Sequence, residues 1–167
     1  MLIRRERPTD VRAVRAVNTA AFPTADEADL VDALCERAAP IVSLVAEVDG
    51  VVVGHILFTP VTLRGHEDAR VMGLAPMAVL PPHQRKGVGS ALVRAGLEEC
   101  AQLGVGAVVV LGHPDYYPRF GFVPASRFGI TSEYEVPDEV FMALELQPGY
   151  LDARSGCVAY HEAFAGL

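Results

Sequence analysis

The chain has 167 residues, of which 51% are hydrophobic and 21% charged, which fits one globular domain with a substantial core. Its formal net charge of −7 argues against a nucleic-acid-binding surface, which requires a basic field. The three cysteines match no disulfide framework or metal site. No apolar run has the length of a membrane span, and the first residues lack a signal-peptide pattern. We therefore expect a cytoplasmic protein with no metal and no membrane partner.

The first third of the chain is predicted to contain a strand, two helices and a β-hairpin. Apolar spacing places the strand at 2–5, a helix opened by Pro8 or Thr9, a second helix at 26–38, and strands at 43–48 and 51–61. The expected inward positions are Val11, Val14, Val17 and Ala21 in the first helix and Leu30, Val31, Leu34 and Cys35 in the second. Asp49-Gly50, between the two strands, is typical of a primed hairpin turn.

A buried central strand is predicted from Val71 to Leu80, because this run is almost entirely apolar. Pro76 inside it has no N–H to donate to a neighbouring strand, so we expect an interruption of the hydrogen-bond ladder there. Pro81 and Pro82 then end the strand for the same reason.

The next stretch, Gln84-Arg-Lys-Gly87-Val-Gly89-Ser90, is a short basic loop that leads into a helix predicted at 89–103. The first N–H groups of a helix are unpaired, and the helix dipole places partial positive charge at the same end. Glycines let an anion approach the backbone, and the loop cations add full charges. The loop therefore predicts a phosphate or pyrophosphate site, with an ordinary helix entry on a flexible glycine turn as the alternative.

The last part of the chain is predicted to complete the sheet. A helix end at Gly104 and a strand at 107–111 form a strand–helix–strand crossover, which makes the two strands parallel. A loop at 112–115, a helical turn at 116–120 and return to the sheet from Phe122 follow, with further strands at 141–146 and 156–160. No linker, repeat or low-complexity tract divides the chain, so residues 1–167 are expected to form a single domain.

Two sequence motifs together resemble a known family. The loop lacks both the G-x-x-x-x-G-K-[S/T] pattern and the third glycine of a dinucleotide fingerprint, but it matches Q/R-x-x-G-x-G/A. Tyr117-Pro-Arg-Phe-Gly121-Phe122 matches a Y-x-x-x-G-F signature. In this order and at this separation they are similar to the GNAT superfamily of N-acetyltransferases, and the longer strings 75–81 and 110–122 resemble its bacterial YhbS-type branch. The resemblance spans nearly the whole chain.

The resemblance implies an α/β fold with a mixed central sheet flanked by helices. In that fold a β-bulge, here expected near Pro76 and Met77, lets the fourth and fifth strands splay apart and admit the pantetheine arm of acetyl-CoA. The first two helices and their joint cover the acceptor site. Asp26, Glu27 and Asp29 make that joint acidic, although acidic residues also favour a helix start without any further role.

The implied reaction is direct attack of a primary amine on the thioester of acetyl-CoA. Tyr117 takes the position of the family's general-acid tyrosine, with Tyr116 beside it as the less favoured candidate, and the main-chain N–H of Met77 is the implied oxyanion donor. The expected cofactor-binding residues, several of them through their backbone, are Met77, Ala78, Val79, Gln84, Arg85, Lys86, Gly87, Val88, Gly89, Ser90 and Tyr117.

The general base stays open, because the strand positions that carry it in many relatives are Gly73 and Ala75 here. The candidates are His55, His113, an acidic residue of the helical joint or a water chain, unless the neutral fraction of the amine reacts unaided. A structural, hydrogen-bonded role is the alternative for His55.

Two rival functions also stay open. One is a non-catalytic acyl-CoA-binding sensor or interaction module, and the other a nucleotide-binding protein. The acceptor, a small-molecule or peptide amine, depends on loops 22–27, 64–70 and 128–142, and both a monomer and a homodimer fit the sequence.

Overall fold

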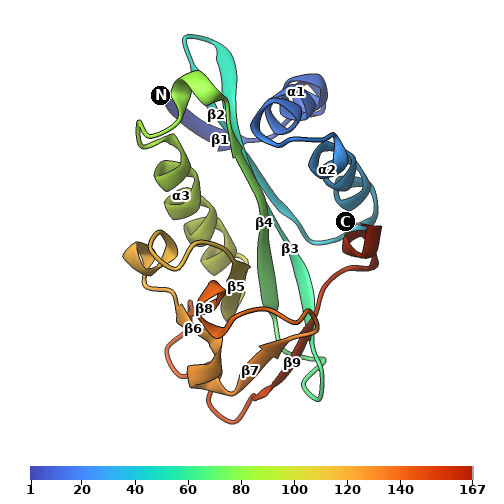
Figure 1. Ribbon diagram of the computed structural model, residues 1–167, viewed down its shortest axis with the longest axis vertical. Helices are drawn as coiled ribbons and strands as arrows, with labels where there is room; N and C mark the ends of the chain where they lie inside the picture. Colours follow the sequence, from blue (N-terminus) through green and yellow to red (C-terminus); the bar gives the residue numbers. More distant parts are fainter. Residues whose placement is uncertain (167) are drawn as a thin grey trace.

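A strongly twisted sheet runs through the molecule, with helices on both of its faces (Figure 1). The computed structural model describes residues 1–166. Its helices are α1 (Val11–Ala21), α2 (Asp26–Arg37) and α3 (Val88–Gln102). Its strands are β1 (Leu2–Arg5), β2 (Val42–Val48), β3 (Val51–Leu63), β4 (Val71–Val79), β5 (Ala107–Leu111), β6 (Val123–Pro124), β7 (Ile130–Ser132), β8 (Phe141–Glu145) and β9 (Gly156–Ala159).

The sheet has the order β1-β2-β3-β4-β5-β8-β6, and only the β4–β5 pair in this path is parallel. β9 pairs antiparallel with the last two residues of β3, Thr62 and Leu63, and parallel with β7. The mixed α/β sheet and the parallel crossover through α3 confirm the predicted fold class. None of the helices within residues 1–166 is long and apolar enough to cross a membrane.

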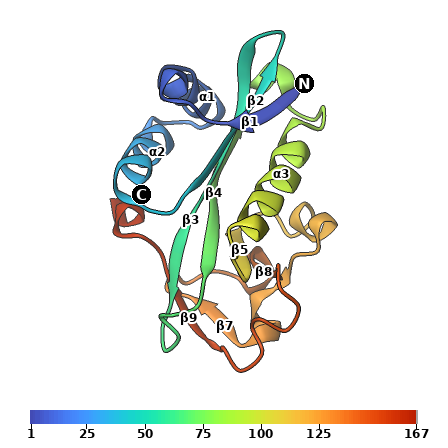
Figure 2. The ribbon, with the colours of Figure 1, turned by 180° about the vertical axis from the view of Figure 1, so that it is seen from behind.

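Alternating side chains of the strands pack into separate core clusters on the two faces of the sheet. Leu44, Ile56 and Phe58 belong to the cluster that packs under α3. Val45 and Leu57, their neighbours in sequence, belong to the cluster under α1 and α2. Figure 2 shows α1 and α2 on one side of the sheet and α3 on the other.

The predicted interruption of β4 is present and has the form of a bulge. Ile56 of β3 pairs with Met77, whereas Phe58 pairs with Leu74, so Ala75 and Pro76 together oppose one residue of β3. The pairing of β4 with β5 ends at Leu74. Beyond this point β4 keeps its pairing with β3 but has no ladder to β5, which confirms the predicted splay.

Several predicted details of the elements were wrong. Val11 is exposed because it lies at the first position of α1, beyond the reach of the core, and Cys35 is exposed although its helix neighbour Leu34 is fully buried. The sequence prediction missed β7, whose three residues show no clear alternation. The other boundaries differ by one or two residues, as helix and strand ends commonly do.

Candidate active site

The loop before α3 adopts the backbone shape of an anion-binding turn. Arg85 has φ of +60° and Gly87 has φ of +86°, so left-handed residues alternate with others and successive N–H groups turn toward one concave side. Gly87 is the N-cap residue of α3, and a Cβ built on it would meet nothing within 4 Å. The Gln84 side-chain amide donates a 2.9 Å hydrogen bond to the Val79 carbonyl, which ties the loop to the end of β4.

A cavity of about 470 Å³ lies over this loop. Its lining residues are Val79, Gln84, Arg85, Gly87, Gly89, Ser90, Tyr116 and Arg119. Five of the predicted cofactor residues do not line it. Met77 and Tyr117 line a second cavity, described below, whereas Ala78 is buried and lines neither cavity. The other two are Lys86 and Val88. The Val88 side chain is buried in the core beneath α3, and Lys86 is exposed outside the cavity, so Val88 could contribute only its backbone.

Two lining residues of this cavity had no cofactor role in the sequence prediction. The Tyr116 hydroxyl lies 3.1 Å from Ser90 Oγ, which links the turn at 117–120 to the start of α3. The Arg119 guanidinium lies 4.5 Å from the centroid of the Tyr116 ring, and its Nε donates to the Tyr116 carbonyl. Tyr116 directly precedes the Tyr-x-x-x-Gly-Phe motif and Arg119 lies inside it. Their spacing of three residues could have revealed them, because it places both on one side of a tight turn.

The splayed edge of β4 leads from this cavity to a second one. Leu80 N–H donates to the Val53 carbonyl on β3. Because main-chain polar groups of alternate residues point to opposite edges of a strand, those of Val79 and Met77 point to the edge that β5 has left. The Met77 side chain lies beside Gly89, where a Cβ would be 3.4 Å from Met77 Cε.

The second cavity, of about 410 Å³, lies at the splay between β4 and β5. It is lined by Phe22, Glu27, Leu30, Leu74, Ala75, Pro76, Met77, Leu111, Tyr117, Tyr134, Tyr160 and Phe164. Of the three loops expected to shape the acceptor site, 22–27 and 128–142 contribute residues, whereas 64–70 contributes none.

Tyr117 reaches this cavity from the turn after β5. Its side chain is buried, with an exposed fraction of 8%, and packs edge to face against Tyr116 and Phe122. Burial, and to a lesser extent the neighbouring Tyr116 phenol, raises the pKa of Tyr117 to about 12. The phenol is therefore protonated at neutral pH.

Among the candidate bases, Glu27 is the one that lines this cavity. Its Oε2 atom is buried and has no hydrogen-bond partner within residues 1–166. His113 lines neither this cavity nor the one over the loop. The Tyr160 hydroxyl, which sequence analysis did not single out, is also buried without a partner in the described part of the chain.

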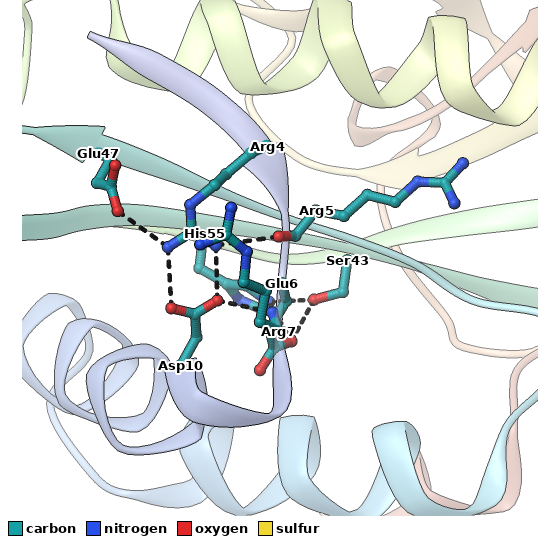
Figure 3. Close-up of polar contacts among 8 residues, drawn as sticks. All are labelled: Arg4, Arg5, Glu6, Arg7, Asp10, Ser43, Glu47 and His55. Atoms are coloured by element: carbon teal, nitrogen blue, oxygen red, sulfur yellow. Dashed lines mark hydrogen bonds and ion pairs between the residues drawn. The ribbon is translucent and has the colours of Figure 1, made fainter. Parts of the chain in front are cut away.

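His55 is fully buried in a polar network away from both cavities (Figure 3). Ser43 Oγ lies 2.9 Å from His55 Nε2 and donates to Glu6, while the Asn18 side-chain amide lies 3.2 Å from His55 Nδ1. This pattern makes Nδ1 the acceptor and Nε2 the protonated nitrogen. Burial lowers the pKa of His55 to about 4, so the ring is neutral, and the structural alternative for His55 fits this environment.

The same figure shows how β1 is held next to this network (Figure 3). The Arg4 guanidinium forms ion pairs with Asp10 at 2.7 Å and with Glu47 at 3.0 Å. These contacts join β1 to the start of α1 and to β2, so they serve the fold beneath the site rather than the cavities.

Comparisons with known proteins agree with this geometry. Residues 11–122 match the model of the Acetyltransferase (GNAT) family. The uncharacterized N-acetyltransferase YjhQ of Escherichia coli (strain K12) is 42% identical over 158 residues, which cover 89% of this chain and 87% of that protein.

Two solved structures are similar over almost the whole chain. The GNAT family N-acetyltransferase YhbS of Escherichia coli, in complex with CoA, has a TM-score of 0.92 and 35% identity over 98% of this chain and 91% of that one. A GNAT family acetyltransferase of Brucella melitensis, in complex with acetyl-CoA, has a TM-score of 0.80 and 39% identity over 98% of this chain and 97% of that one. The matched family model, the identity to these relatives and the structural similarity over almost the whole chain show that the chain belongs to the GNAT family of acetyltransferases.

Proposed function

We propose that this protein transfers an acetyl group from acetyl-CoA to a primary amine by direct attack within a ternary complex. One observation carries the proposal. The unpaired edge of β4 runs from a basic cavity at the start of α3 to an aromatic cavity that holds the Tyr117 phenol. A long, extended thioester with a diphosphate at one end has the shape and charge that this path requires.

The cofactor end of the proposal rests on the loop at 84–90. Its backbone N–H groups, the positive end of the α3 dipole and the Arg85 and Arg119 side chains would hold the diphosphate. Pantetheine would lie along β4 and pair with the main chain of Met77 and Val79 as an added strand. The relatives solved with CoA and with acetyl-CoA support this assignment.

The chemical step needs an oxyanion donor and a proton donor. As the amine nitrogen bonds to the thioester carbonyl carbon, the carbonyl oxygen becomes negative, and the Met77 N–H near the bulge would stabilise it. The C–S bond then breaks, and Tyr117 would give its proton to the leaving sulfur. Because burial raises the pKa of Tyr117, the phenol keeps its proton until the thiolate leaves.

The amine must lose two protons over the reaction, one before attack and one from the tetrahedral intermediate. Glu27, which lines the cavity, would accept the first, directly or through water, and release it to solvent. The second restores the Tyr117 phenol. The net products are the acetylated amine, free CoA thiol and one proton.

Replacing Tyr117 with Phe tests the proposal, because it removes the proton donor and keeps the ring. We expect turnover to fall by about 10²–10⁴-fold with acetyl-CoA affinity near that of the wild type. The assay follows release of free CoA thiol with a panel of primary amines, and calorimetry follows acetyl-CoA binding. Full activity in Tyr117→Phe would remove Tyr117 from the mechanism. Acetyl-CoA binding without thiol release under any amine would instead support a non-catalytic binding module.

A further inference from the structure

We infer that the acceptor is a compact monoamine with an apolar, ring-bearing body, whose ammonium group binds Glu27 and whose body packs on an aromatic wall. The inference rests on the proposed function and goes beyond it by naming the substrate class. The wall is defined by four side chains of the second cavity: Phe22, Tyr134, Tyr160 and Phe164.

Three rings of the aromatic wall, from separate parts of the chain, lie in contact with one another, and Phe22 lines the same cavity. The Tyr134 and Tyr160 rings are stacked, with centroids 5.5 Å apart and an angle of 27° between their planes. The Phe164 ring follows at 5.4 Å from the Tyr160 ring. Rings in such an arrangement favour flat apolar groups, and their faces also attract a nearby cation.

Glu27 supplies a negative charge that an acceptor with a positive charge would neutralise. Within residues 1–166, it is the one lining residue of the cavity with a carboxylate or a basic group. Its Oε2 atom is buried without a hydrogen-bond partner in that part of the chain. A buried carboxylate oxygen without a partner is costly, and an ammonium group from the acceptor would supply both the donor and the opposite charge.

The presence of a single carboxylate among the described lining residues of the cavity also argues against a polycationic acceptor. A polyamine or an oligosaccharide with several ammonium groups would bring further charges into a cavity whose other lining side chains are apolar or phenolic. Each ammonium beyond the first would lose its hydration without gaining a carboxylate. The cavity volume of about 410 Å³ also lies at the small end of the range of about 300–1,000 Å³ usual for ligand sites.

Tyr160 adds a second polar point on the wall. Its ring lies over Gly73 of β4, where a Cβ would stand 3.2 Å from Tyr160 Cε1, so the absence of a side chain at Gly73 lets the ring reach the cavity. The Tyr160 hydroxyl is buried without a partner in the described chain. A polar substituent on the body of the acceptor could therefore hydrogen-bond there.

The test separates the effect of charge from the effect of shape. Calorimetry measures the affinity of the protein for each ligand in the presence of saturating CoA, because the complex with CoA has no acetyl group to transfer. The ligands are 2-phenylethylamine, its uncharged analogue 2-phenylethanol, and spermidine. For the wild type we expect 2-phenylethylamine to bind at least 10-fold more tightly than either of the others. Glu27→Gln should abolish the preference for the amine over the alcohol, whereas Glu36→Gln should keep it, since Glu36 lies on the same helix, is exposed and does not line the cavity.

Two outcomes would overturn the inference: tighter binding of spermidine, or an unchanged amine preference in Glu27→Gln. Thiol release measured with the same amines distinguishes these from failure of the proposed function. If no amine yields free CoA, the transferase proposal fails. If spermidine yields it faster than 2-phenylethylamine, the proposal stands and the acceptor class is wrong.

Discussion

The ring of Tyr117 occupies the space that a side chain at Gly112 would need. A Cβ built on Gly112 would lie 2.3 Å from Cε2 of Tyr117, far inside contact distance. Gly112 directly follows the last residue of β5, and Tyr117 begins the turn that closes the cavity. The missing side chain at the end of β5 is therefore a condition for the position of the phenol.

Gly112→Ala should accordingly disable the proposed general acid, Tyr117, without replacing that residue. We expect the methyl group to displace the Tyr117 ring, so that turnover falls toward that of Tyr117→Phe, by about 10²-fold or more. Overpacking at a buried site also costs about 1–3 kcal/mol, which a thermal or urea unfolding curve would show. Steady-state thiol release, measured well below the melting temperature, checks the effect on turnover.

A glycine remote from the site provides the control. Gly65 lies in the β3–β4 loop with φ of +89° and no atom within 4 Å of a built Cβ, so Gly65→Ala strains the backbone alone. We expect it to lower stability and leave turnover unchanged. If Gly112→Ala lost stability to the same degree with turnover intact, the Tyr117 ring position would not matter for the reaction.

Arg119 is expected to contribute to cofactor affinity rather than to chemistry. Its guanidinium lies against the Tyr116 ring and lines the cavity over the α3 start, where a diphosphate would be. Charge-assisted hydrogen bonds contribute about 1.5–3 kcal/mol, so Arg119→Gln should weaken acetyl-CoA binding by about 10-fold or more. Calorimetry at two salt concentrations checks this, because the loss should shrink at high salt.

Arg127→Gln is the matched control for this charge change. Arg127 is exposed and does not line the cavity, so its replacement should leave acetyl-CoA affinity unchanged. Equal affinity of the Arg119→Gln variant and the wild type at low salt would contradict a diphosphate position next to Arg119.

Local signals in the sequence predicted much of this site. Pro76 marked the bulge, because its missing N–H is a property of the residue itself. Asp49-Gly50 predicted the hairpin turn, and both residues have positive φ, as a type I′ turn requires. The loop at 84–90 could likewise be read in isolation, since its chemistry depends on residues adjacent in the chain.

The aromatic wall could not be predicted in the same way. Tyr134 precedes β8, Tyr160 follows β9, and Phe164 lies in the turn Glu162–Gly166, which an ion pair between Arg37 and Glu162 joins to α2. Their meeting depends on the pairing of β9 with both β3 and β7, contacts between residues far apart in sequence. Single residues without periodic neighbours carry no signal of such pairing. Phe22 and Tyr134 lay in loops that were expected to shape the acceptor site, whereas Tyr160 and Phe164 lay outside those loops.

The buried His55 predicts a pH dependence of stability. Its pKa in the folded protein is about 4, below the value near 6.5 expected for an unfolded chain. The unfolded state therefore binds more protons between these values, and the stabilisation is present above pH 6.5 and lost as pH falls toward 4. From pH 7 to pH 5 the free energy of unfolding should drop by roughly 2 kcal/mol on account of this residue.

His55→Gln isolates this contribution, because the amide can keep a hydrogen bond but does not titrate. Glu6 faces the ring, with Oε1 at 3.8 Å from His55 Nε2, and burial raises the pKa of Glu6, so its contribution has the opposite sign and persists in both proteins. Urea unfolding of the wild type and the variant at pH 7 and pH 5 gives the difference directly. We expect the variant to be less stable at pH 7 and to lose less stability by pH 5. Parallel losses in the two proteins would mean that His55 takes up no protons on unfolding, and that the polar network holds it already charged.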